Sequence, residues 1–275
     1  GRDIAGTADT IKGISRIDLW NYYKKYYVPR NMVLVVAGNV EKYPSKSGVG
    51  HFVGVDKKNG SASTLVKEFA SYAWQASQPL ENRVGVSQRK LDQSHLIMGF
   101  PGLKYGHPDR FAASVLLNIL GGGMSSRLFV EVREKRGLAY MINAGGGSFR
   151  DAGVVNIQAG LDPSRLSEAL KVITEELKKI SETNVSAKEL ANAKSNISGR
   201  MTLSMEDSSA QAQWFARQFL FNKKIETCEQ VIKNIKKVSI QDVKRVAKNI
   251  FDLKETRVAV IGPKDKEEII KILKY

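Results

Sequence analysis

The amino-acid sequence predicts an α+β fold in which a mostly antiparallel sheet is covered by helices. Short apolar runs typical of strands cluster between residues 94 and 160, and one more occurs near the end of the chain. The long stretch between these two regions repeats its apolar residues at helical spacing. Because strands and helices are segregated and do not alternate regularly, an antiparallel sheet is favoured over a parallel βαβ arrangement.

The first group of elements lies between residues 94 and 160. Strands are expected at 94–100, 138–147 and 153–159. Helices are expected at 108–120 and 125–136, the second ending at Gly137. The Gly121-Gly122-Gly123 sequence between these helices lacks the Gly-Lys-Ser/Thr of a phosphate loop, so we interpret it as a flexible break.

The second group is helical. A long helix is expected after Asp162-Pro163, with one core-facing stripe at 4-3-4-3 spacing made of Leu166, Leu170, Ile173, Leu177 and Ile180. Ser186 and Glu189 form a capping-box pattern at the start of the next helix. More helix is expected through 214–220 and 229–237.

An internal repeat relates the two ends of the chain. Residues 14–38 align without a gap to residues 238–262, with identical Ser, Asp, Lys, Val and Gly residues at five positions. Each copy reads as a Ser-x-x-Asp helix start, an amphipathic helix, a polar turn and a buried strand, at 32–37 and 257–261. A duplication predicts that the first copy begins upstream of residue 1. The alternative is a complete chain whose two units resemble each other by convergence.

These patterns divide the chain into three parts. Residues 1–41 are interpreted as the tail of a truncated first domain, 42–84 as a linker or irregular insertion, and 85–275 as a second domain. A short amphipathic helix is expected within the insertion, at 64–75.

Composition narrows the possible partners and compartment. The net charge of +15 would attract nucleic acid, but the basic residues are scattered and no nucleic-acid-binding motif accompanies them. The single cysteine, Cys228, excludes an internal disulfide and is interpreted as an idle thiol. No apolar run approaches the roughly 20 residues of a membrane span, and no signal segment opens the sequence, which favours the cytoplasm.

The familiar metal and hydrolase motifs are missing from this sequence. The histidines are His51, His95 and His107, and none belongs to a His-x-x-Glu-His or His-Glu-x-x-His pattern. His51 lies in the insertion, His95 is interpreted as a core histidine on an apolar strand, and His107 as a surface residue. No Gly-x-Ser-x-Gly elbow occurs either. The sequence therefore predicts no metal site and no catalytic residue in this chain.

The strongest local cluster is the basic segment 126–140, SRLFVEVREKRGLAY. Arg133 and Tyr140 lie seven residues apart across the helix-to-strand turn at Gly137. Both side chains are hydrogen-bond donors, and together they would hold a carbonyl or an oxyanion. The alternative is a salt bridge on the helix face for Arg133 and packing for Tyr140, which the residues alone favour.

Three segments resemble one protein family. They are GFPG at 99–102, LLNILGGGMSSRLFVEVREKRGLAY at 116–140 and DAGVVNIQAG at 151–160. They are similar to the second domain of the pitrilysin/insulinase zinc metallopeptidases, in the branch near mitochondrial processing peptidase. Residues 1–40 resemble the end of the first, catalytic domain of that family.

The resemblance implies two homologous domains around a peptide-holding chamber, with zinc bound by the first domain of the full-length parent or by a partner chain. It implies that Arg133 and Tyr140 bind the substrate peptide, while this chain holds no cofactor of its own. The expected partners are the peptide, the missing first domain or a zinc-bearing homologous chain, in a possible homo- or heterodimer. No nucleic-acid or membrane partner is expected.

Three functions remain compatible with the sequence. The first is a part of an active zinc endopeptidase, and the second is a part of a non-catalytic subunit that donates its side chains to a zinc-bearing partner. The third and most remote is a basic nucleic-acid-binding module. The chain alone is expected to be inactive as a peptidase.

Overall fold

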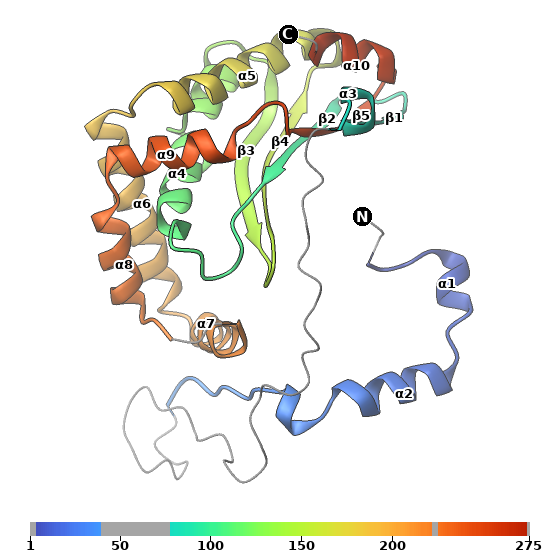
Figure 1. Cartoon of the computed structure of the whole chain (residues 1–275), viewed down its shortest axis with the longest axis vertical. Coiled ribbons are helices and arrows are strands. Elements are labelled where there is room, and N and C mark those ends of the chain that lie inside the picture. Colours follow the sequence, from blue (N-terminus) through green and yellow to red (C-terminus); the bar gives the residue numbers. More distant parts are fainter. Residues whose placement is uncertain (1–3, 40–77, 222–224, 274–275) are drawn as a thin grey trace.

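The computed structural model describes residues 4–39, 78–221 and 225–273, and a five-stranded sheet lies at its centre (Figure 1). The strands are β1 Val84–Gln88, β2 Ser94–Pro101, β3 Ala139–Ser148, β4 Gly153–Leu161 and β5 Arg257–Gly262. Their order across the sheet is β1-β5-β2-β4-β3. The β1–β5 pair is parallel and the other three pairs are antiparallel, which confirms a mostly antiparallel sheet.

The helices of the sheet-bearing unit are α3 Leu80–Arg83, α4 Arg110–Gly121, α5 Leu166–Glu182, α6 Ala187–Ser204, α7 Ser208–Phe221, α8 Cys228–Lys237, α9 Ile240–Ile250 and α10 Lys266–Leu273. Helices α4, α5, α6, α8 and α9 gather on one side of this sheet, and α3 and α10 lie near β1 at its edge (Figure 1). Among the described residues, no helix is both long enough and apolar enough to cross a bilayer.

The core lies between the sheet and these helices. On β2 the buried side chains alternate with exposed or half-buried ones, and Leu96, Met98 and Phe100 point toward the helices. The stripe expected on α5 is fully buried at Leu166, Leu170, Ile173, Leu177 and Ile180. Phe100 meets Phe251 edge to face, with ring centroids 5.2 Å apart, where α9 leads into β5. The sequence pattern therefore identified the core correctly.

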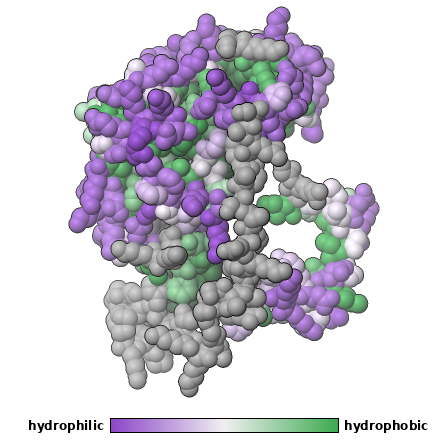
Figure 2. All heavy atoms as spheres, viewed as in Figure 1, coloured by the Kyte–Doolittle hydropathy of each residue, from purple (hydrophilic) through white to green (hydrophobic). Residues whose placement is uncertain are grey.

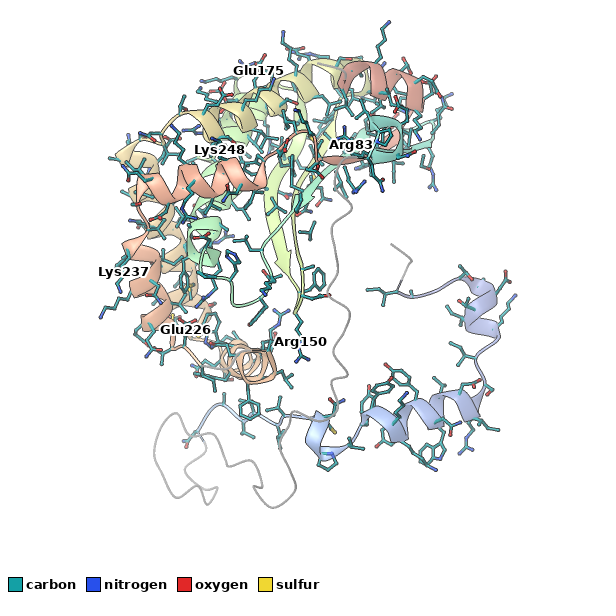
Figure 3. All side chains as sticks on the ribbon, in the orientation of Figure 1. Arg83, Arg150, Glu175, Glu226, Lys237 and Lys248 are labelled. Carbon is teal, nitrogen blue, oxygen red and sulfur yellow. The ribbon has the colours of Figure 1, made fainter. Side chains whose placement is uncertain are left out.

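Two polar clusters tie distant segments together (Figure 3). Arg83 donates to the carbonyl oxygens of Gln78 and Thr256 at 2.9 and 3.0 Å, which joins α3 to the segment before β5. Glu226, between α7 and α8, accepts a 2.5 Å ion pair from Arg110 of α4, and its carbonyl accepts from Trp214 at 3.1 Å. The Arg83 contacts therefore link α3 to the start of β5, and the Glu226 contacts link α4 and α7 to the segment before α8.

One expectation about local structure is corrected. Within the described residues, α3 begins at Leu80, five residues before the expected domain start at residue 85, and the division into domains stays a prediction. Gly121 closes α4 but is no flexible break, because a Cβ atom there would collide with the backbone of Ala144 on β3. Close contact between helix and strand explains this glycine. The helix expected at 64–75, and nearly all of the 42–84 insertion, lie outside the described residues.

The N-terminal segment differs from the rest. It contains α1 Ala8–Lys12, α2 Arg16–Tyr26 and a short 3₁₀ turn at Pro29–Asn31, and none of its described residues is buried. Residues 32–37, expected as a strand, form no strand. A strand needs a neighbouring strand to satisfy its backbone groups, and no described strand pairs with this segment.

Candidate functional site

The basic segment adopts an unusual helix. Residues Phe129–Glu134 form a π-helix where an ordinary α-helix was expected, and the N–H of Lys135 donates to the carbonyl of Val130 at 2.9 Å. Val132 anchors the turn in the core. Gly137, with φ of 60°, then reverses the chain into β3, and its N–H donates to the carbonyl of Arg133 at 3.0 Å. Short π-helical segments occur frequently at functional sites.

Arg133 differs from the other cations of this segment. Arg127 pairs with Glu189 of α6 at 2.7 Å, while Lys135 and Arg136 pair with Glu131 at 2.6 and 2.7 Å. Lys135 and Arg136 hold the pKa of the Glu131 carboxyl below its usual range.

The Arg133 side chain is exposed and lies over the ring of Phe129, with 4.9 Å from its guanidinium carbon to the ring centroid. Within the part of the chain that the structure describes, it forms no ion pair. Stacking on a ring orients the guanidinium and leaves its N–H donors free for another acceptor. The described residues therefore do not form the helix-face salt bridge that was considered from the sequence.

Tyr140 lies at an irregularity of the sheet. Ala139 pairs with Leu161 and Met141 with Gly160, so Tyr140 is the extra residue of a β-bulge. Its side chain is 59% exposed. Bulges re-aim a side chain and are enriched next to active sites. The alternative considered from the sequence was packing for Tyr140, and more than half of its side chain is exposed in the structure.

The face of the sheet away from the helices carries polar and apolar side chains. Asn143 of β3 lies opposite Gln158 of β4, which in turn lies opposite Ile97 of β2. Gln158 is exposed, as is 43% of Ile97. This row follows Tyr140 along β3 and offers neutral amide donors and acceptors beside an apolar side chain.

The histidines form no metal site with one another. His95 is exposed on the open face of β2, which corrects the expectation of a core histidine: the alternation of the strand turns it away from Leu96. His107 is half-buried, and its Nδ1 accepts from the N–H of Asp109 at 3.1 Å. His51 lies outside the described residues. Among those that are described, no three His, Cys, Asp or Glu side chains gather as metal ligands, so zinc has no site in them.

Cys228 opens α8 and is half-buried, and burial raises the pKa of its thiol. A raised pKa lowers the thiolate fraction, which fits the idle role expected from the sequence.

The irregular backbone around Arg133 and Tyr140 has no clear sign in the sequence. A helical pattern does not distinguish π from α hydrogen bonding over one turn, and a bulge adds only one residue to an apolar strand. The spacing of seven residues across Gly137 was the signal that the sequence did carry.

The known proteins similar to this chain that follow are named as proteases or as peptidase domains. Curated relatives include an uncharacterized zinc protease of Streptomyces coelicolor, 32% identical over 97% of this chain and 58% of its own length. Another, from Bacillus subtilis, is 31% identical over 96% of this chain and 61% of its own length. The chain thus spans about three fifths of the length of these curated relatives.

Solved structures share the fold. A protease from Helicobacter pylori matches 93% of this chain and 61% of its own with a TM-score of 0.77 and 22% identity. A peptidase M16 inactive domain from Pseudomonas fluorescens matches 66% of this chain and 44% of its own with a TM-score of 0.62 and 23% identity.

The family model described as the peptidase M16 inactive domain matches residues 13–197, which is more than half of the chain. The match includes both Arg133 and Tyr140, and it agrees with the resemblance to pitrilysin-type peptidases. The curated relatives described above are named zinc proteases. On the match of the family model, this chain belongs to the peptidase M16 inactive-domain family.

Proposed function

We propose that this chain is the part of a zinc endopeptidase that closes the peptide chamber and holds the substrate through Arg133 and Tyr140. The observation that carries the proposal is the exposed guanidinium of Arg133, which forms no ion pair with the residues that the structure describes, in a segment whose other cations are all engaged. A charged side chain without a protein partner is available for a ligand.

The two side chains supply complementary donors. The Arg133 guanidinium presents a rigid fork of N–H groups, and the Tyr140 phenol presents one O–H. A peptide carbonyl accepts from both, and the attraction grows as the oxygen gains negative charge during attack on the carbonyl carbon. Arg133 and Tyr140 bind and orient this carbonyl, whereas bond cleavage itself requires groups outside the described residues.

Preorganisation supports the same role. Phe129 holds the guanidinium from one side, Val132 fixes the π-turn in the core, and the bulge turns Tyr140 outward. Donors held in place before the substrate arrives need no costly reordering during the reaction. The amides of Asn143 and Gln158 on the open face of the sheet would contact the backbone of the same peptide farther along.

The test uses the product of the complete reading frame that contains this sequence. Arg133→Ala and Tyr140→Phe are each expected to lower kcat/KM for a fluorogenic peptide by about 10²–10³, the usual loss for one donor to an oxyanion. Their melting temperatures should change little, because both side chains are exposed. Lys135→Ala is the matched control, since it removes a neighbouring cation that already pairs with Glu131.

The outcomes separate a substrate-holding role from a structural one. Equal losses for Lys135→Ala and Arg133→Ala would show that charge in general, and not the Arg133 site, is needed. Unchanged kcat/KM in both Arg133→Ala and Tyr140→Phe would refute the assignment. The 275-residue chain alone is expected to cleave nothing, and chelator-sensitive cleavage by it would contradict the proposal.

A non-catalytic subunit is the alternative. It would carry the same two side chains but serve the zinc of another chain. Zinc analysis of the complete product distinguishes the two: bound zinc with activity supports the endopeptidase. A zinc-free product that becomes active only with a second chain supports the subunit.

A further inference from the structure

A cavity opens between helices α4 and α6, on the side of the sheet that carries the helices. Its volume is about 400 Å³. In this part of the molecule α4 packs against both β3 and α6 (Figure 1). Pockets that bind small molecules have volumes of about 300–1,000 Å³, so a small organic ligand has room here. Neither Arg133 nor Tyr140 lines this cavity.

Part of the cavity lining is apolar. Leu117 of α4, Ala144 of β3, and Ile197 and Met201 of α6 are half-buried there. In the view of Figure 2, the surface of the sheet-bearing unit is mostly hydrophilic, and its apolar side chains lie mostly behind polar ones. A half-buried apolar lining inside a cavity is therefore a place where an apolar group of a ligand gains free energy by leaving water.

The charged group of the lining is Arg200 of α6. Its side chain is exposed, and its Nη1 lies 3.4 Å from the carbonyl oxygen of Gly122, beyond the usual hydrogen-bond range of about 2.7–3.2 Å. Among the residues that the structure describes, no carboxylate pairs with Arg200 and none lines the cavity. The guanidinium therefore makes the cavity positive and keeps N–H donors available for an anion.

Asn118 of α4 adds an acceptor to the same cavity. Its Nδ2 donates to Oδ1 of Asn196 at 3.0 Å, which orients the amide. Within the part of the chain that the structure describes, its own Oδ1 accepts no hydrogen bond, so that oxygen is available to an N–H of a ligand. A Cβ atom at Gly122 would come within 2.8 Å of Nδ2 of Asn118, so the glycine leaves room for this amide.

We propose that the cavity binds the C-terminal residue of a peptide that ends in an apolar amino acid. Arg200 binds the terminal carboxylate, because the guanidinium fork matches two carboxylate oxygens. Oδ1 of Asn118 accepts the N–H of the same residue, and the apolar side chain packs against the lining around Ile197. A free C-terminal residue of this kind carries all three groups together: the anion, the N–H donor and the apolar side chain.

Other anions match fewer of the groups that line the cavity. Inorganic phosphate would use Arg200 but leave the apolar lining unused and place an anion beside an acceptor oxygen. A fatty acid would use Arg200 and the apolar lining, but it has no N–H for Oδ1 of Asn118. An internal acidic residue would bring its carboxylate without an adjacent apolar side chain.

The test is direct binding, measured by ligand-observed NMR titration of the product of the complete reading frame at pH 7. The probe is N-acetyl-leucine, and the matched control is N-acetyl-leucine amide, which has the same shape and no charge. The acid should bind about 10–100-fold more tightly than the amide, since hydrogen bonds to a charged group are the strong ones. A second comparison uses 4-methylpentanoate, which lacks the N–H and should bind about 2–10-fold more weakly than N-acetyl-leucine.

Three variants locate the probe. Arg200→Ala should weaken binding of N-acetyl-leucine about 10–100-fold and keep the melting temperature of the parent, because the side chain is exposed. Arg217→Ala is the matched control, since it removes an exposed arginine of α7 that does not line the cavity. Arg133→Ala should also leave the affinity unchanged. The inference does not rest on the proposed peptidase role, because this binding requires no bond cleavage.

Four results would overturn the proposal. Equal affinities for the acid and the amide would exclude recognition of the carboxylate, and an unchanged affinity in Arg200→Ala would exclude that residue. Equal losses in Arg200→Ala and Arg217→Ala would show a general effect of charge. A loss in Arg133→Ala without one in Arg200→Ala would place the probe at the other arginine. Equal affinities for N-acetyl-leucine and 4-methylpentanoate would contradict the role of Asn118 and identify a simple carboxylic acid as the ligand instead.

Discussion

The two copies of the repeat have the same local structure and different surroundings. Hydrogen bonds from Ser15 hold the pKa of the Asp18 carboxyl below its usual range, and those from Ser239 do the same for Asp242. Yet α9 buries its apolar face and leads into a strand, whereas α2 is exposed and the residues after it form no strand. Caps and helix length are thus encoded locally, but the strand is not.

The difference follows from where each hydrogen bond is made. A helix satisfies its backbone groups within one segment, so a capping box and an amphipathic sequence define it without outside help. A strand satisfies them only on a neighbour, and β5 has neighbours on both sides. The second copy also has an ion pair that the first cannot make. Arg245 binds Asp109, the N-cap residue of α4, at 2.6 Å, whereas the first copy has Asn21 at the position of Arg245.

The largest expected effect compares β5 with the corresponding segment of the first copy. Val260→Asp places a carboxylate in a position that is 1% exposed, and should cost more than about 4 kcal/mol of unfolding free energy or abolish folding. The equivalent change in the first copy, Val36→Asp, should leave the unfolding free energy of the 275-residue chain unchanged. Urea denaturation followed by circular dichroism measures both. A comparable loss in Val36→Asp would mean that residues 32–37 already pack against the described core.

The capping box of α6, formed by Ser186 and Glu189, also has a contact from outside its own helix, because Arg127 pairs with Glu189. Burial alone would raise the pKa of Glu189, but hydrogen bonds from Arg127 and Ser186 outweigh it and lower the pKa to about 2. A lowered folded-state pKa stabilises the protein above the unfolded value of 4.5. This stabilisation is lost as the pH falls from that value toward about 2.

Glu189→Gln is therefore expected to destabilise the chain at pH 7 by about 2 kcal/mol, reduced from the full value of the pKa shift because the side chain is one-third exposed. The difference between variant and parent should shrink as the pH falls to about 3. Thermal unfolding at the two pH values measures it. Glu168→Gln removes a more exposed ion pair with Arg165 and serves as the control. A difference that stays constant with pH would contradict the assigned pKa.

The sequence predicted correctly those features that depend on residues within a single segment. The stripe from Leu166 to Ile180 and the capping boxes at Ser186 and Ser239 were predicted and confirmed. It failed where a distant segment decides the outcome. His95 looked like a core residue because its strand is apolar on both faces, and only the one-sided helix layer leaves it exposed.

The candidate site shows the same division. The spacing of Arg133 and Tyr140 was visible in the sequence, but the residues alone favoured a salt bridge and packing. Among the described residues, Arg133 has no carboxylate partner, because Glu131 and Glu189 pair with neighbouring cations. Which cation pairs with which carboxylate depends on how α6 packs against the π-helix, and a local sequence pattern does not show this packing.

The smallest expected effect returns to the helix caps. Ser239→Ala removes the N-cap of α9, which is packed in the core, and should lower the unfolding free energy by about 1 kcal/mol. Ser15→Ala removes the same hydrogen bonds from α2, but should leave the global unfolding free energy unchanged in the 275-residue chain and only reduce the local helix population. Amide exchange over residues 16–26 and 240–250 measures both effects separately.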